Sequence, residues 1–525
     1  MVQATTYSAP DRRPMRWLLA ALIIAGALAT LYSYSHDLII AYGDAESHLN
    51  IAKRIAQSIT PGLAQLGGIW LPLPHLLMLP LVIIEPLYRT GLAGAIISGI
   101  CYCISGLYIY KTGKLLTGSI AAALVAAAVF ALNPNILYLQ STPMTELPLI
   151  ACFVVSTYFF IKFVQNDTDT LALIGAAFFG FLATLMRYDG WFLVIFEALG
   201  IVVLYTLRAW RWRALEGKLI LFGTLAFLGV ALWLSWDFMI LGDAFYFTNS
   251  PFSAKSQQNG WAARGQLPSY HDIGSSLAYY TLTAAINSGM IIFGVAVVGL
   301  LAYLLIKPSW NKAVITLVLL VPYIFYVLTL YMGQSIILIP QLTPASFGNQ
   351  IFNVRYGTVM IPGIAVLVGY VFMYRHIVWR ALIVLLVAGN LAAFYAGQAP
   401  VITIDDGRYG LSHLSTPDAE GFIRGEYDHG LVLMDDFGKS ISIIKSGLPM
   451  QEMIYIGNKP YWEDGLRAPQ HDIRWIIMQR DDLVWKNFFT DPAKEAELYK
   501  YFEKVYTSPD LVIFRRNTGV VAATQ

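Results

Sequence analysis

The sequence predicts a polytopic α-helical membrane protein that ends in a small soluble α/β domain. The chain has 525 residues, of which 57% are hydrophobic and only 13% are charged, and its mean hydropathy is +0.58. Soluble domains carry about 25% charged residues on average. The apolar residues also gather in runs of about 20, the length with which a helix spans a bilayer. Together these observations exclude an ordinary soluble protein.

Eleven apolar segments have the length of membrane-spanning helices. The first, residues 17–34, follows Arg12, Arg13 and Arg16 and lacks an evident small-residue cleavage site, so we expect a retained helix rather than a signal peptide. The remaining ten lie at 91–110, 115–132, 146–164, 170–186, 190–207, 218–240, 278–306, 312–331, 356–374 and 378–396.

Residues 71–88 are also apolar, but four prolines interrupt them. Because proline removes a backbone donor and kinks helices, we interpret this stretch as an interfacial or re-entrant segment. If it does not cross, the N-terminal arginines share one side of the membrane with the basic residues of the later loops. These are Lys111, Lys114, Arg208, Arg211, Arg213, Lys218, Lys307, Lys312, Arg375 and Arg380. The positive-inside rule makes that side the cytoplasm.

The opposite side then holds the first long loop, residues 35–90, and everything after residue 396. The last part alternates apolar β-like runs with helical stretches such as 492–504, which predicts an α/β domain of ordinary size. Its expected strands are 431–434, 473–478 and 511–514. We therefore expect a transmembrane domain, 1–396, and an extracytoplasmic α/β domain, 397–525. The N-terminus of this multi-pass cell-membrane protein is expected in the cytoplasm.

An acidic stretch directly after the first predicted span contains Asp44, Glu46 and His48. Ionisable groups beside a membrane are costly, which makes them functional candidates. If a helix runs from Asp44 to about Ile59, Asp44 and His48 share one face and Glu46 points elsewhere. Asp44 is then a candidate general base, or the N-cap of an interfacial helix, and both readings stay open.

Two further sites with ionisable groups lie on the same predicted face. Glu146 stands at the mouth of a span, where it is a second acid, a metal ligand or simply a favourable charge in a first helical turn. Arg187 and Asp189 lie at the junction of two spans. They either pair with each other or leave Arg187 for an anionic phosphate, which a guanidinium binds well.

A fourth outward site is Arg355 with Tyr356, at the head of a later span. Arg355 either reaches lipid head groups or binds a substrate phosphate, and a second cation on the same face makes a phosphate site more plausible. Lys255 in the polar loop 241–275 is a weaker candidate cation. His75 follows the proline-rich residues of the first loop and is either structural or directed at substrate.

Taken together, the chain resembles the GT-C superfamily of glycosyltransferases, which includes protein O-mannosyltransferases, aminoarabinose transferases and oligosaccharyltransferases. The residues that carry the resemblance are Asp44 and Glu46 in the first outer loop, the proline-rich segment 71–74 followed by His75, and Glu146 in the second outer loop. The many-span core followed by an outer α/β domain is also similar.

The resemblance implies a sugar donor linked to polyprenyl phosphate and a reaction on the side away from the cytoplasm. It makes Asp44 the acid that deprotonates the acceptor, with Glu146 as a second acid. Arg355 is similar to the cations that hold the donor phosphate. Oligosaccharyltransferases use a paired acid motif with a metal in the second loop, whereas this loop has Glu146 alone. We therefore expect no obligatory metal, with a divalent metal kept as the alternative.

The predicted function is thus a polyprenyl-phosphate-sugar-dependent glycosyltransferase of the cell envelope. The expected partners are the lipid-linked donor, membrane lipids, and a protein, glycolipid or polysaccharide acceptor. Scattered basic residues and a net charge of +2 predict no nucleic-acid binding. The three cysteines form no CxxC pair and indicate neither zinc nor a disulfide framework. The alternatives are a transporter or flippase of lipid-linked sugars and, last, a ligand-sensing receptor.

Overall fold

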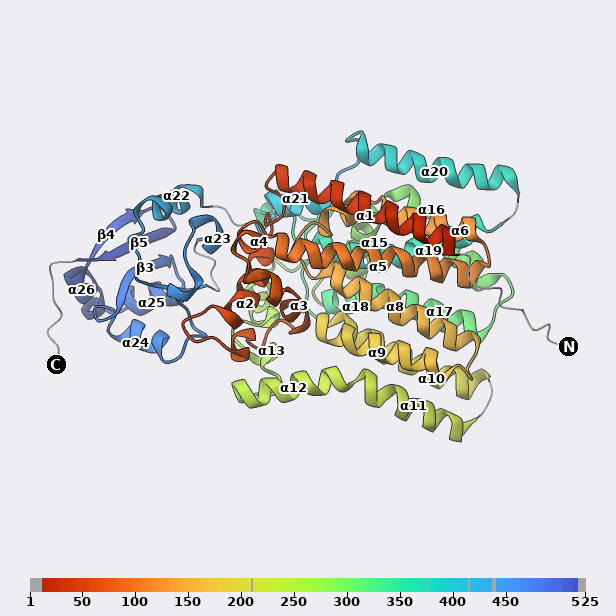
Figure 1. The fold of residues 1–525 in the computed structure, drawn as a ribbon, viewed down its shortest axis with the longest axis horizontal. Helices are drawn as coiled ribbons and strands as arrows, with labels where there is room; N and C mark the ends of the chain where they lie inside the picture. The colour runs from red at the N-terminus through yellow and green to blue at the C-terminus, as the bar shows by residue number, and fades with distance from the viewer. Residues whose placement is uncertain (1–11, 209–210, 375, 414–415, 437–440, 518–525) are drawn as a thin grey trace. The chain divides into compact units, whose positions relative to one another are not determined.

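The structure, a computed structural model, describes residues 12–208, 211–374, 376–413, 416–436 and 441–517 (Figure 1). Arg375 of the expected cytoplasmic loops and the last residues of the expected domain, 518–525, lie outside this part. The chain divides into two compact units. Unit 1 is formed by residues 1–39 and 94–411, and unit 2 by residues 40–93 and 412–525.

Unit 1 is a bundle of apolar helices that run side by side in Figure 1. Its helices are α1 (Arg12–Ser35), α5 (Leu92–Thr117), α6 (Ile120–Ala131), α7 (Pro134–Leu139), α8 (Glu146–Gln165), α9 (Thr170–Met186), α10 (Asp189–Val203), η2 (Leu204–Arg208), α11 (Trp212–Ala226), α12 (Leu228–Leu241), α13 (Tyr246–Asn249), α14 (Ala254–Ala263), α15 (Ile273–Ser288), α16 (Met290–Leu305), α17 (Trp310–Leu319), α18 (Val321–Tyr331), η3 (Ala345–Phe347), η4 (Val354–Met360), α19 (Ile361–Phe372), α20 (Ile377–Tyr395) and α21 (Ile402–Tyr409).

The number of spans differs from the expected eleven. Among the described residues, six helices are long and apolar enough to cross a membrane, or up to nine if each bent pair counts as one span. The expected spans 115–132 and 170–186 are the shorter apolar helices α6 and α9. At 1.5 Å per residue α6 is only about 18 Å long, short of the roughly 30 Å hydrocarbon layer.

The expected span 278–306 is not one continuous helix, because the chain bends by 111° between α15 and α16. The bend lies at Gly289, whose φ of +87° favours glycine. A Cβ added there would lie 2.1 Å from the side-chain oxygen of Asn390. The Asn390 amide in turn donates to the carbonyl of Ser288, 3.3 Å away, and so satisfies an acceptor at the helix end.

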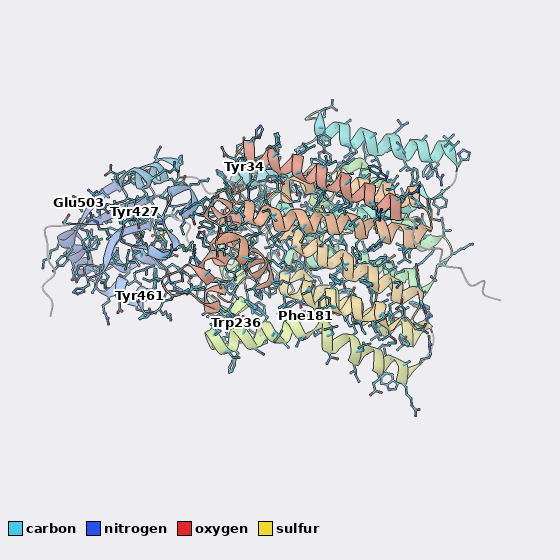
Figure 2. The ribbon with its side chains drawn as sticks, viewed as in Figure 1. Tyr34, Phe181, Trp236, Tyr427, Tyr461 and Glu503 are labelled. Carbon is cyan, nitrogen blue, oxygen red and sulfur yellow. The ribbon has the colours of Figure 1, made fainter. Side chains whose placement is uncertain are left out.

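Small residues let the helices of unit 1 approach one another closely, as is common in membranes. A Cβ on Gly299 of α16 would lie 2.5 Å from the carbonyl oxygen of Leu367 in α19. A Cβ on Gly369 of α19 would lie 2.7 Å from the carbonyl oxygen of Ala122 in α6. Figure 2 draws the side chains of these helices as sticks, with Phe181 of α9 labelled.

One end of this bundle carries basic loops. Asp167, just after α8, accepts hydrogen bonds of 2.6 Å from Arg208 and 2.6 Å from Arg211. The Arg208 guanidinium also donates to the side chain of Asn311, 3.1 Å away. The other end of α8 is Glu146, and this helix of 20 residues is about 30 Å long. The basic end and Glu146 therefore lie on opposite ends of the bundle.

Unit 2 contains a five-stranded sheet in the order β2-β1-β3-β5-β4. Its central strands are the three that the sequence predicts, and β5 reverses the direction of the sheet, because it pairs antiparallel with β3 while β1 pairs parallel. The strands are β1 (Leu431–Met434), β2 (Met453–Ile454), β3 (Ile473–Gln479), β4 (Phe502–Thr507) and β5 (Leu511–Arg516). The helices that accompany them are α22 (Pro417–Glu426), α23 (Ile443–Ser446), η5 (Met450–Glu452), α24 (Tyr461–Arg467), α25 (Leu483–Phe489) and α26 (Pro492–Tyr501). The expected small α/β domain is confirmed.

The first outer loop belongs to unit 2 rather than to the helical bundle. It folds into α2 (Gly43–Ala56), η1 (Leu63–Leu66), α3 (Leu73–Val82) and α4 (Glu85–Arg89). The proline-rich segment 71–88 therefore forms two short helices, neither of which has the length of a span.

Candidate functional site

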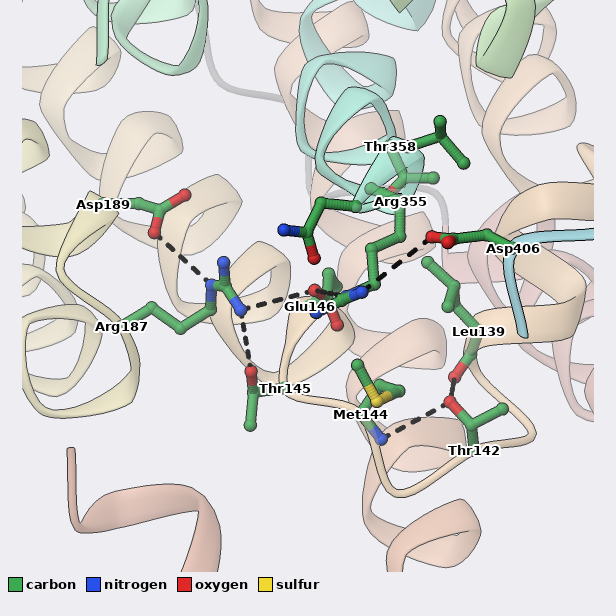
Figure 3. A network of polar contacts seen from close by, with 12 residues as sticks. Leu139, Thr142, Met144, Thr145, Glu146, Arg187, Asp189, Arg355, Thr358 and Asp406 are labelled. Carbon is green, nitrogen blue, oxygen red and sulfur yellow. Dashed lines mark hydrogen bonds and ion pairs between the residues drawn. The ribbon is translucent and has the colours of Figure 1, made fainter. Parts of the chain in front are cut away.

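Five buried or mostly buried charged side chains of unit 1 gather at the end of the bundle that carries Glu146 (Figure 3). They come from four places in the sequence: the start of α8, the turn between α9 and α10, the helix η4 and the helix α21. In the order of their contacts they are Asp189, Arg187, Glu146, Arg355 and Asp406. We call this set the charge cluster.

Glu146 is at the centre of the charge cluster. Its Oε1 accepts a hydrogen bond of 3.3 Å from Nη1 of Arg187 and one of 3.1 Å from Nε of Arg355. The Glu146 side chain is fully buried, so both guanidinium groups compensate a carboxylate that water does not reach. Arg355 also lies 3.9 Å from a carboxylate oxygen of Asp406.

Arg187 donates hydrogen bonds from all three nitrogens of its guanidinium group. Its Nε donates to Asp189 over 3.3 Å, its Nη1 also to the Thr145 hydroxyl over 3.0 Å, and its Nη2 to the Tyr326 hydroxyl over 3.2 Å. Arg187 directly follows α9 and Asp189 opens α10, so the turn between two helices presents both charges at once. The pairing of Arg187 with Asp189, one of the two alternatives that the sequence leaves open, is present, and Glu146 is a further partner.

Three tyrosine rings line the charge cluster. Tyr280 stacks on Tyr326 with centroids 5.0 Å apart, and Tyr326 stacks on Tyr356 at 4.9 Å. The guanidinium carbons of Arg187 and Arg355 lie 5.2 and 5.1 Å from the centroid of the Tyr356 ring. Tyr356 therefore makes a cation–π contact with both cations and fixes their separation.

The cluster has three carboxylates for two guanidinium groups, a formal charge of −1 when all are ionised. In addition, Oε2 of Glu146 and Oδ1 of Asp189 are buried and have no hydrogen-bond donor within the part of the chain that the structure describes. A buried carboxylate oxygen without a donor is costly. The two oxygens are therefore ready to accept hydrogen bonds from hydroxyl or amine groups of a ligand.

Asp44 lies in unit 2, in the first turn of α2, and its side chain is half-buried. The helix begins at Gly43 and its N-cap is Tyr42, whose side chain makes no capping bond. The alternative in which Asp44 is the N-cap is therefore wrong. Asp44 is the second residue of the helix, near the positive end of the helix dipole.

Glu46 points away from Asp44, as the helical spacing predicts. Its carboxylate accepts a hydrogen bond of 2.5 Å from the Ser442 hydroxyl and one of 3.1 Å from the amide of Ile444. Burial raises the pKa of Glu46, although these two hydrogen bonds oppose the shift. Both contacts belong to the α/β domain of unit 2, so Glu46 serves the internal structure of that unit.

His48 and His75 form a buried pair in unit 2. Their Nδ1 and Nε2 atoms lie 3.0 Å apart, and the His48 ring packs against Trp70 with centroids 4.6 Å apart. His75 is fully buried, and this burial lowers its pKa to about 3. It is therefore a neutral side chain at physiological pH, consistent with a structural role.

The structure separates the remaining candidates. Lys255 is exposed on α14, with no ion pair to the charge cluster among the described residues. Asp406 and Tyr326 are members of the site that sequence reasoning missed. Asp406 lies in a segment that looked like the start of the soluble domain, but α21 packs in unit 1. Its sequence signal is weak: Asp405 and Asp406 directly follow the short segment Ile402 to Ile404.

No group of three or more His, Cys, Asp and Glu side chains suited to a metal ion occurs in the described ranges. The charge cluster does not supply one, because Glu146 and Asp189 share Arg187 and Asp406 faces Arg355. Each carboxylate thus already has a cationic neighbour.

Comparisons with known proteins agree with this fold. Residues 87–236 match the family model described as dolichyl-phosphate-mannose-protein mannosyltransferase. No curated protein matches the chain. The structure is similar to that of ArnT from Cupriavidus metallidurans bound to undecaprenyl phosphate, with a TM-score of 0.59 and 11% identity over 98% of this chain and 100% of that one.

Two further structures are similar. ArnT in the apo state gives a TM-score of 0.56 with 12% identity over 96% of this chain and 99% of that one. The apo oligosaccharyltransferase of Archaeoglobus fulgidus gives 0.51 with 13% identity over 97% of this chain and 75% of that one. These likenesses confirm the expected resemblance to GT-C glycosyltransferases at the level of the fold, and a multi-pass membrane protein with it.

Replacement of Glu146 by alanine is expected to destabilise unit 1 strongly. The change leaves two guanidinium groups at a buried site without their shared carboxylate, a loss that costs about 3–5 kcal/mol for buried ion pairs. Thermal unfolding of the purified protein in detergent measures the effect. The matched control is Glu216→Ala, which removes an exposed glutamate on α11. Equal unfolding temperatures for the two variants would contradict the central role of Glu146.

Acid is expected to destabilise unit 2 through His75. The histidine has a pKa of about 3 in the folded protein and about 6.5 when unfolded, so between these values the unfolded state binds more protons. Stability is therefore fully present above pH 6.5 and falls by up to about 1.4 kcal/mol per pH unit towards pH 3. Denaturant unfolding between pH 7 and pH 4, compared with His75→Gln, measures this slope. An identical slope in the variant would refute the assignment.

Proposed function

We propose that this chain, which has the GT-C fold, is a glycosyltransferase that moves a sugar from a polyprenyl-phosphate-linked donor to an extracytoplasmic acceptor. The observation that carries the proposal is the charge cluster, where a cation lies beside two buried carboxylate oxygens without donors, at one end of a membrane-embedded bundle. A phosphate-linked sugar has a phosphate anion, which the cation would bind, and several hydroxyl groups, which would donate to the two carboxylate oxygens. The similar ArnT structure holds undecaprenyl phosphate.

Arg187 is the better of the two candidate cations for the donor phosphate. Its side chain keeps 18% of its surface exposed, whereas that of Arg355 keeps 3%. Arg355 instead donates a hydrogen bond to Glu146 and lies near Asp406. We propose that Arg355 fixes the position of the Glu146 carboxylate, which in turn orients Arg187. Preorganised charges of this kind stabilise a departing phosphate as its negative charge develops, because they need not reorient during the reaction.

Glu146 and Asp189 are proposed to hold the sugar. Their free oxygens, Oε2 and Oδ1, accept hydrogen bonds from sugar hydroxyl groups while their other oxygens bind Arg187. Tyr356 keeps the cations in place through its ring. A ligand with several hydroxyls also supplies the donors that these buried atoms lack.

Asp44 is proposed as the general base. In a transfer from a phosphate-linked donor, the acceptor oxygen attacks the anomeric carbon, the bond from that carbon to the phosphate oxygen breaks, and the acceptor proton goes to the base. The half-buried carboxylate of Asp44 suits this step better than that of Glu46, which is buried and engaged by Ser442. The buried His48–His75 pair supports the helix that carries Asp44.

A transporter or flippase of lipid-linked sugars is the second candidate, favoured by one observation. The 111° bend between α15 and α16 is a broken helix of the kind that transporters use at substrate sites. A flippase moves its lipid without consuming it, so the two functions differ in whether the bond between sugar and phosphate survives.

The Asp44→Asn variant is expected to fold normally and to lose sugar transfer by at least about 100-fold, the usual contribution of a general base. Purified protein is incubated with polyprenyl-phosphate sugars and candidate acceptors, and the products are identified by mass. The control is Asp37→Asn, which changes an exposed acid located two residues after the end of α1. Full activity of the Asp44 variant would remove it from the mechanism, and donor translocation without cleavage would favour the flippase.

The proposed topology places the N-terminus and the basic end of the bundle in the cytoplasm, and unit 2 outside. It rests on Arg208 and Arg211 lying at the end of α8 opposite to Glu146. A phosphatase that is active only outside the cytoplasm, fused after Gln525, is expected to be active, although Gln525 itself lies outside the described residues. Activity of a cytoplasm-specific reporter at the same position would overturn the topology.

A further inference from the structure

We propose that the α/β domain of unit 2 anchors α2 and thereby orients Asp44, with Glu46, Ser442 and Arg89 as positioning residues. The functional part of this inference rests on the proposed role of Asp44 as base. The anchoring part rests only on contacts within unit 2. These contacts occur at the beginning, in the first turn and near the end of α2.

The first anchor is the carboxylate of Glu46. It accepts hydrogen bonds from the Ser442 hydroxyl and the amide of Ile444. Both donors lie at the start of the short helix α23, whose N-cap is Ser442. Glu46 and Ser442 are both buried, and they are 396 positions apart in the chain. Hydrogen bonds to a buried charged group are among the stronger ones in proteins. This pair therefore ties the first turn of α2 to the domain.

Arg89 binds the backbone of the same segment, from the start of α23 to just after its end. Its guanidinium donates to four backbone carbonyls, those of Ile443 at 3.0 Å, Ile444 at 3.3 Å, Gly447 at 3.4 Å and Leu448 at 3.0 Å. One planar fork with five donors can satisfy such a set, whereas a lysine ammonium cannot.

Arg89 is itself connected back to α2. Its Nε donates to Glu85 over 2.6 Å, and Glu85 also accepts from the buried Lys53 on α2. The turn at α23, the helix α4 and the helix α2 are thus joined in one polar network. A change at Arg89 is expected to reach α2 by two routes, through Glu85 with Lys53 and through the turn that Glu46 binds.

The second and third anchors lie at the ends of the helix. Near its C-terminal end Arg54 pairs with Asp436, and its guanidinium carbon lies 3.8 Å from the centroid of the Tyr455 ring. At its start the amide of Gly43 donates to the carbonyl of Ser412 over 2.9 Å. Glu46 and Arg54 are about 12 Å apart along the axis at 1.5 Å per residue. Anchors this far apart fix both the position and the rotation of the helix.

The Glu46 anchor lies on the other side of the helix from Asp44. Asp44 and Glu46 are two residues apart, which rotates their side chains by about 200° around the axis of a helix with 3.6 residues per turn. Glu46 faces the turn at α23, so Asp44 faces away from it. The bond between Glu46 and this turn therefore does not itself occupy the carboxylate that is proposed to act on the acceptor.

The experiment compares Ser442→Ala and Arg89→Ala with Ser442→Thr, which keeps the hydroxyl, in the full-length protein. The first readout is hydrogen exchange of the α2 amides, which needs no sugar-transfer activity. The second is kcat and the KM for the lipid-linked donor. The matched control is Arg474→Ala, since Arg474 also joins an acid, Asp428, to a backbone carbonyl within unit 2.

Anchoring predicts that Ser442→Ala and Arg89→Ala accelerate exchange in α2 by about tenfold or more, the effect of losing a hydrogen bond to a charged group. Positioning predicts that kcat falls by a similar factor while the donor KM stays unchanged, with Ser442→Thr close to the original protein. The Arg474 control leaves α2 exchange and kcat unchanged.

Unchanged exchange in α2 would overturn the anchoring. Faster exchange in α2 with unchanged kcat would overturn the positioning role. If the amides of β3 and β5 gain as much exchange as those of α2, the substitution unfolds unit 2 in general, and this too would overturn the positioning role. If the original protein transfers no sugar, the proposed function and the positioning of a base both fail, whereas the exchange data still decide whether the domain anchors α2.

Discussion

The contact on which the helical unit depends is the one between Glu146 and two guanidinium groups. A buried carboxylate loses several kcal/mol of hydration free energy, and well-placed cations offset that loss. Arg187 and Arg355 do so from segments that are 168 positions apart in the sequence. The start of α8, the turn before α10 and the helix η4 therefore have to meet at one point, and Asp406 brings α21 to the same place. The cluster fixes the geometry of one end of the bundle.

The two ends of the bundle use charge differently. At the far end of α8, Asp167 faces two arginines that keep part of their surface exposed, so water shares in their solvation. At the near end the carboxylates outnumber the guanidinium groups, and the carboxylate side chains are buried. Exposed ion pairs contribute little to stability, whereas buried ones are costly unless complete. Two oxygens of this buried set, on Glu146 and Asp189, have no donor among the described residues, and this is why we propose that the cluster binds a ligand.

The features that could be predicted from the sequence are those that short stretches of residues determine. Alternating apolar runs marked the strands at 431–434 and 473–478, and the Arg187–Asp189 spacing marked an ion pair at a helix junction. The sequence did not reveal features that depend on distant partners. The bend at Gly289 requires a positive φ and an approach to Asn390, which hydropathy does not register. Asp406 was missed because only Arg355, 51 positions earlier, reveals its role.

The same argument applies to the acidic stretch after the first helix. Local spacing correctly separates Asp44 from Glu46, but it cannot say what fixes α2 in space. The hydrogen bond from Ser442 to Glu46 joins residues 396 positions apart, so a partner of α2 lies in the C-terminal domain, far from the loop in sequence. Contacts with such long sequence separation form late, because closing the intervening chain costs entropy before they are made. The role that we propose for the domain at the end of the chain is therefore to hold the helix that carries an acid near its beginning.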